Sequence, residues 1–177
     1  DPLGEAYNAL AAVKEDTNDL EGAEAAYKRA LELNPNHALS LHWYGWMLRS
    51  RLGRPEEALE LHRRASELDP LSGVMAINVE ADLEALGRFE EAEKWLDKVK
   101  ELTPDYPDLY TAIGDLRSSV YGRLDEAIVA YTKALSLDPD NISCLVALGF
   151  TYLNLGDPSQ AEQWIRRSID LGPESVA

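Results

Sequence analysis

The sequence repeats itself with a period of 34 or 35 residues along almost its whole length. Five segments align, each closing with a proline and a polar turn, and the prolines are Pro35, Pro70, Pro104, Pro139 and Pro173. A period of this length is typical of arrays in which each repeat buries its apolar face against its neighbours. We therefore expect residues 1–177 to form a single array, with repeats at about 4–37, 38–72, 73–106, 107–141 and 142–175.

Each repeat contains two apolar stretches at helical spacing. Proline stands in the first turn of the second stretch at Pro55 and Pro158, where its missing N–H costs no hydrogen bond. The closing proline of each repeat disfavours the helical conformation in the residue before it. The two stretches are separated by a residue that tolerates a left-handed backbone, namely Asn18, Gly53, Gly87, Gly122 and Gly156. The chain is predicted to be all-α, with one helix hairpin per repeat.

Small residues indicate where the two helices of a hairpin meet. A large side chain at such a site would cost about 1–3 kcal/mol through overpacking. The first helices carry Ala11, Gly45, Gly114 and Gly149, and the second carry Ala23, Ala58, Ala92, Ala127 and Ala161. The core around them is predicted to contain Leu10, Tyr27, Tyr44, Leu96, Tyr131, Leu148 and Ile165.

This pattern of residues resembles the tetratricopeptide repeat (TPR). The fifth repeat matches it with Leu148, Gly149, Tyr152, Ala161 and Pro173, and the fourth with Ala127, Tyr131, Ala134 and Pro139. The resemblance implies a right-handed α-solenoid of five hairpins. It also predicts irregular packing where the pattern is broken, at Lys14, His62, Glu80 and Arg117. The stretch 43–72 is more narrowly similar to repeats of bacterial signalling proteins with winged-helix, nucleotidyl-cyclase or TolB-like domains, which would make this chain the sensing or docking part of a regulator.

The resemblance implies a concave groove that is lined by the first helices and binds peptides or partner helices. The residues at groove positions are Asn8, Ala12, His42, Trp46, Arg49, Ile77, Ala81, Glu84, Thr111, Asp115, Ser118, Val146, Phe150 and Leu153. Trp46 and Phe150 are expected to contribute most to binding, because exposed aromatics dominate interface energies. The alternative for Trp46 is a core position. Trp43 is predicted to be packing, and His42 a solvated histidine rather than a pH sensor or ligand contact.

Charge argues against nucleic-acid binding. The chain has 17 basic and 32 acidic residues, a formal net charge of −15, whereas binding to phosphates requires clustered cations. The one basic cluster is predicted to be a solvated face balanced by neighbouring acids, and the alternative is a dock for an acidic partner segment. Its members are Arg49, Arg51, Arg54, Arg63 and Arg64. Of the positions at which some TPR proteins clamp a chaperone's terminal carboxylate, only Asn8 fits.

Catalysis, metals and cofactors are not expected. The sequence holds no glycine-rich phosphate loop, nucleophile elbow or metalloprotease signature, and its histidines lack ligand spacing. Cys144, the one cysteine, is predicted to be a small buried hydrophobe. A single cysteine allows no internal disulfide and is consistent with a reducing, cytoplasmic compartment. No apolar run approaches the roughly 18 residues of a membrane-spanning helix.

The ends of the sequence suggest a piece of a longer protein, because it begins at Asp1 without a methionine. On the last helix, Trp164, Ile165 and Ile169 are expected to leave apolar surface uncovered, so that either the chain continues or two copies pair as a homodimer. Two functions remain open. One is a protein-interaction module with a groove ligand, and the other is a structural or oligomerisation element that uses its ends and convex face. A helper within an enzyme complex is a third interpretation.

Overall fold

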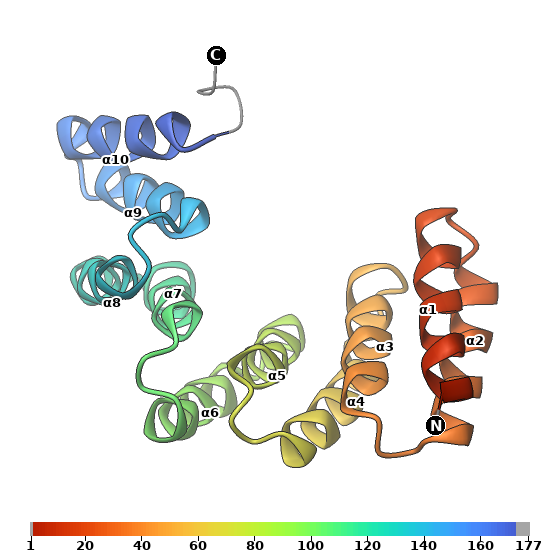
Figure 1. Cartoon of the computed structure of the whole chain (residues 1–177). Helices are drawn as coiled ribbons and strands as arrows, with labels where there is room; N and C mark the ends of the chain where they lie inside the picture. The colour runs from red at the N-terminus through yellow and green to blue at the C-terminus, as the bar shows by residue number, and fades with distance from the viewer. Residues whose placement is uncertain (1, 173–177) are drawn as a thin grey trace. The chain divides into compact units, whose positions relative to one another are not determined.

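The computed structural model describes residues 2–172, and all of the regular structure within this range is helical. An all-α solenoid is confirmed as the fold class, whereas Pro173 and the end of the fifth predicted repeat lie outside the described residues. A π-helical segment, η1 (Leu116–Val120), continues the seventh helix. The α-helices, drawn in Figure 1, are α1 (Pro2–Asp16), α2 (Leu20–Leu33), α3 (Ala38–Ser50), α4 (Pro55–Leu68), α5 (Gly73–Ala85), α6 (Phe89–Leu102), α7 (Pro107–Asp115), α8 (Leu124–Leu137), α9 (Ile142–Asn154) and α10 (Pro158–Asp170).

The turns inside the hairpins use the left-handed residues that the sequence predicts. Their φ angles are positive at Asn18 (59°), Gly53 (63°), Gly87 (68°), Gly122 (65°) and Gly156 (86°). Such a residue reverses the chain directly after a helix, because its backbone cannot continue the right-handed spiral. The second helices then begin as predicted, with α4 starting at Pro55 and α10 at Pro158.

The contacts divide the chain after Ala92 into two compact units. The N-terminal unit contains α1 to α5 and the first residues of α6, and the C-terminal unit contains the rest of α6 and the helices that follow. In the N-terminal unit, α4 packs against both α3 and α5, and in the C-terminal unit α8 packs against both α7 and α9. Within each unit, neighbouring hairpins therefore stack on one another.

The predicted close approach within hairpins is confirmed. A Cβ atom on Gly45 would lie 2.6 Å from the His62 ring, and one on Gly149 would lie 2.7 Å from Ile165. The core prediction was wrong for Leu10, which is 43% exposed. Leu3 and Val13 are exposed as well. These positions share one face of α1, and α2 packs on the other face.

The two 35-residue spacings differ from the 34-residue ones at the end of the first helix. In the shorter repeats, the backbone N–H of the residue that follows the left-handed residue donates to the carbonyl oxygen five positions earlier in the chain. An example is Arg88, which donates to Leu83 (2.8 Å). In the longer repeats it donates six residues back, from Arg54 to Leu48 (2.9 Å) and from Arg123 to Arg117 (2.7 Å). The extra residue is therefore absorbed there, and in α7 it produces the π-helical segment η1.

Candidate functional site

A pocket of about 230 Å³ lies between the first three helices of the N-terminal unit. Its lining combines three aromatic rings with two carboxylates and an amide, and we call it the aromatic–acidic pocket. The lining residues are Asn8, Ala12, Glu15 and Asp16 of α1, Tyr27 of α2, and Trp43 and Trp46 of α3. Three residues of the predicted groove, Asn8, Ala12 and Trp46, are thus brought together.

Two tryptophans on α3 form one wall of this pocket. Trp43 and Trp46 are three residues apart, so they lie on one face of the helix. Their ring centroids are 6.5 Å apart with an interplanar angle of 75°, an edge-to-face arrangement. Trp43 is 45% exposed and Trp46 is 36% exposed. The prediction that Trp43 is packing was therefore wrong, because its ring contacts Trp46 at the pocket instead of entering the hairpin core.

The polar lining of the pocket includes three groups that accept hydrogen bonds, on Asn8, Glu15 and Asp16. The buried Tyr27 hydroxyl donates to Glu15 Oε1 at 2.5 Å. Two causes raise the pKa of Tyr27, of which burial is the larger and the hydrogen bond to this carboxylate the smaller. The tyrosine therefore stays neutral and holds Glu15 in place. Asp16 is exposed, and Asn8 Oδ1 is buried without a hydrogen-bond partner among the described residues. A ligand that donates hydrogen bonds and carries positive charge would satisfy these groups.

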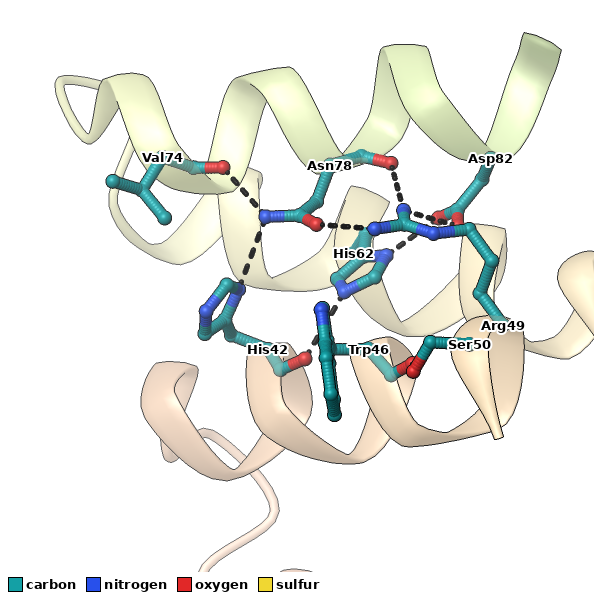
Figure 2. A network of polar contacts seen from close by, with 8 residues as sticks. All are labelled: His42, Trp46, Arg49, Ser50, His62, Val74, Asn78 and Asp82. Atoms are coloured by element: carbon teal, nitrogen blue, oxygen red, sulfur yellow. Dashed lines mark hydrogen bonds and ion pairs between the residues drawn. The ribbon is translucent and has the colours of Figure 1, made fainter. Parts of the chain in front are cut away.

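A buried polar network lies beside this pocket, where α3, α4 and α5 meet (Figure 2). His62 is fully buried and contacts two acceptors, with Nδ1 2.5 Å from Asp82 Oδ2 and Nε2 3.0 Å from the His42 carbonyl oxygen. Arg49 donates to Asp82 Oδ1 (2.8 Å) and to the backbone and side-chain oxygens of Asn78 (3.1 and 2.9 Å). Asp82 has no exposed surface, so these partners replace its hydration.

This network corrects the expectations for two groove residues. His42 was predicted to be solvated, but it is 5% exposed and its ring packs edge-on against Trp43. Burial, with added repulsion from His62 and Arg49, lowers the pKa of His42 to about 4. It is therefore neutral at pH 7 and withdrawn from solvent. The Arg49 guanidinium is bound to α5, so it joins α3 to α5 and is not free for a ligand carboxylate.

The remaining groove residues lie on α5, α7, η1 and α9. Phe150 and Leu153 on α9 are exposed, at 57% and 53%. Asp115 is exposed and accepts a hydrogen bond from the Tyr131 hydroxyl at 2.7 Å. The others are half-buried: Ile77, Ala81, Glu84, Thr111, Ser118 and Val146.

The predicted apolar end face on α10 is only partly present. Ile169 is 66% exposed. Trp164 is half-buried, and its indole Nε1 is buried without a hydrogen-bond partner among the described residues. Ile165 was expected both in the core and on this end face, and its side chain packs over Gly149 inside the hairpin, as the core prediction has it.

Each arginine of the basic cluster contacts another residue of the chain. Arg54 pairs with Glu57 and with Glu24, whose pKa is lowered to about 2 by its hydrogen bond from Lys28 and, more weakly, by Tyr44 and Arg54. The other members also have partners within the chain, with Arg51 donating to Asn18, Arg63 pairing with Glu91 and Arg64 donating to Asn36. Carboxylates therefore balance Arg49, Arg54 and Arg63, whereas Arg51 and Arg64 contact only neutral amide oxygens.

Cys144 is buried as predicted. Its thiol lies 3.4 Å from the Tyr131 carbonyl oxygen, and burial raises its pKa to about 11. A thiol in this state is not a nucleophile at neutral pH. Among residues 2–172, no group of histidine, cysteine and acidic side chains is placed to hold a metal ion. In the same range, none of the helices has the length and apolar content needed to span a bilayer.

Four family models match the chain, and all four describe the tetratricopeptide repeat. They match residues 4–37, 26–60, 83–106 and 121–176, which together cover more than half of the chain. Protein FlbA of Caulobacter vibrioides is 30% identical over 157 residues, which are 88% of this chain and 26% of FlbA. The chain spans about a quarter or less of the first curated relatives it matches.

Solved structures share the fold. The TPR protein TTC0263 of Thermus thermophilus is 21% identical with a TM-score of 0.82, and the similarity covers 98% of this chain and 93% of that one. YrrB, described as a TPR protein with an unusual peptide-binding site, is 23% identical with a TM-score of 0.60. The similarity covers 95% of this chain and 86% of the YrrB chain. From the repeat spacing, the helix hairpins and these matches, the chain belongs to the tetratricopeptide repeat family.

Proposed function

We propose that this chain is a protein-interaction module whose N-terminal unit binds a basic peptide segment in the aromatic–acidic pocket. One observation carries this proposal. Two exposed tryptophans share a pocket with Asp16, Glu15 and the unpartnered Asn8 Oδ1. Lysine or arginine of a bound peptide would donate to these acceptors and pack its cation against the indole rings.

The size of the pocket agrees with a peptide side chain as ligand. Its volume of about 230 Å³ is below the roughly 300–1,000 Å³ typical of small-molecule sites. The formal charge of −15 would also attract a basic segment over longer distances. Repeat proteins of this class present extended surfaces to their partners, and the peptide-binding site ascribed to YrrB supports a peptide as ligand.

Short fluorescein-labelled peptides would test this proposal. The peptides share one apolar composition and carry lysine and arginine, aspartate and glutamate, or glutamine. We expect the basic peptides to bind most tightly, and Trp46→Ala to weaken their binding by about thirtyfold, equivalent to about 2 kcal/mol. Trp46→Phe, which keeps an aromatic face, should retain most of the affinity.

Charge reversal supplies the matched control. Asp16→Lys should weaken the binding of the basic peptides. Glu60→Lys, on the exposed surface of α4, should leave their affinity unchanged. Circular dichroism would establish that all variants are folded. Equal binding of the basic and glutamine peptides, or full affinity in Trp46→Ala, would contradict a basic ligand at this pocket.

The exposed apolar surface of α10 favours the alternative function, association through the end of the array. Ile169 is 66% exposed there. In that case Ile169→Asp would abolish concentration-dependent dimerisation measured by light scattering, and Trp46→Ala would have no effect on it.

A further inference from the structure

A second pocket, of about 580 Å³, lies in the C-terminal unit between α6, α7 and α8. We call it the lysine-flanked pocket. It is lined by Lys100, Tyr110, Ile113, Arg117, Glu126, Val129, Ala130 and Lys133. None of these residues belongs to the predicted groove or to the aromatic–acidic pocket. A ligand here would therefore occupy a site of its own, independent of the proposed function.

The lining includes an apolar surface that the chain itself does not cover. Val129 on α8 is 71% exposed, and Ile113 and Ala130 lie beside it in the pocket. Covering such an exposed side chain with an apolar group of a ligand is favourable, because it removes apolar surface from water.

The positive charges around this surface are not equivalent. Arg117 pairs with Glu93 and with Glu126, where Nε and Oε2 are 3.3 Å apart, so its charge is compensated. Lys100 and Lys133 form no ion pair among the described residues, and the Lys133 ammonium lies 5.6 Å from the centroid of the Tyr110 ring. In a chain with 32 acidic residues, two uncompensated lysines therefore flank one apolar pocket.

The local backbone contributes to this arrangement. Arg117 lies in η1, the π-helical segment that holds the extra residue of the fourth repeat. Segments of this kind are frequent at functional sites. By pairing with Glu93 of α6 and Glu126 of α8, Arg117 joins the two helices that border the pocket.

We propose that the lysine-flanked pocket binds an acidic segment of a partner protein. The segment inserts one large apolar side chain against Ile113, Val129 and Ala130, and its carboxylates contact Lys100 and Lys133. The apolar contact holds the segment, and the lysines select against basic segments. Lysine suits this role because its flexible stem brings a compact charge to carboxylates in varied positions.

The test uses the whole chain and short fluorescein-labelled acidic peptides with or without a central phenylalanine. We expect the peptide with phenylalanine to bind, and the double variant Lys100→Glu and Lys133→Glu to weaken its binding by about tenfold or more. Val129→Asp should have an effect of similar size. The control Lys94→Glu, which changes an exposed lysine of α6 outside the pocket, should leave the affinity unchanged.

Trp46→Ala separates this proposal from the first. It should leave the acidic peptide bound, and loss of that binding would place the peptide at the aromatic–acidic pocket and overturn the present proposal. Equal affinity with and without phenylalanine, or unchanged affinity in the double lysine variant, would overturn it too. Stronger retention of decanoate than of either peptide would show a site for fatty-acid anions instead of protein segments.

Discussion

The two units bury different rings at equivalent positions beneath a glycine. In the N-terminal unit His62 lies under Gly45, and in the C-terminal unit Tyr131 lies under Gly114. The phenol of Tyr131 needs one strong acceptor, which Asp115 supplies at 2.7 Å. The imidazole of His62 has two polar nitrogens, and neither of them reaches water.

The consequence of this difference extends to a third helix. His62 on α4 requires Asp82 on α5 and the backbone of α3, and Asp82 in turn requires Arg49. The stacking of α5 on the α3–α4 hairpin is therefore tied to a charged network. Tyr131 instead binds within its own hairpin, where Asp115 ends α7. One change of ring thus decides whether a repeat junction depends on buried charge.

Removing Asp82 should have the largest effect on this comparison. Asp82→Ala leaves Arg49 and His62 without their carboxylate, and breaking a buried pair in this way destabilises by about 3–5 kcal/mol. Hydrogen exchange should show faster opening of α3 to α5, with α7 to α9 protected as before. The exposed control Glu60→Ala should change neither unit. Equal loss of protection in both units would mean that the network does not act locally.

The second largest effect should be a loss of stability of the N-terminal unit at acidic pH. The pKa of His42 is about 4 in the folded chain, below its ordinary value of 6.5, so only the unfolded state takes up this proton between those values. Stability is therefore full above pH 6.5 and falls as the pH decreases, by about 2 kcal/mol on reaching pH 5. The C-terminal unit contains no histidine and lacks this dependence.

Urea unfolding at a series of pH values would measure the effect of acid, with His42→Leu as the reference. The leucine variant cannot take up a proton at this position, so its stability should change less over the same range. Identical pH profiles for the two proteins would contradict the assignment to His42.

The sequence predicts the hairpins well because they depend on local signals. The positive φ angles, the helix-initiating prolines and the small-residue contacts all follow from residue type and spacing. Exposure is harder to predict, since it depends on which way a helix turns against its neighbours. Trp43 and Leu10 are solvent-exposed and His42 is buried, although all three lie on the first helices of repeats.

The polar network could be found from sequence only in part. His62 departs from the repeat pattern, and a buried histidine in place of an aromatic residue needs polar partners nearby. Its partner Asp82 lies 20 residues away, on the next hairpin. No spacing rule within one repeat connects the two residues, because their contact depends on how α5 stacks on α4. The lysine-flanked pocket could not be predicted either, because its lining comes from several helices that meet only in the folded chain.

The smallest expected effect concerns the tyrosine of the C-terminal unit. Tyr131→Phe removes the hydroxyl that donates to Asp115 but keeps the ring under Gly114. Asp115 keeps exposed surface, although burial raises the pKa of its carboxyl, so the loss should be that of an ordinary hydrogen bond, about 1 kcal/mol in urea unfolding. His62→Phe is the matched change in the N-terminal unit, and it should cost more because it leaves Asp82 with one buried partner fewer. If the two substitutions destabilised equally, the buried charge would add nothing beyond an ordinary hydrogen bond, and the contrast between the units would reduce to ring shape.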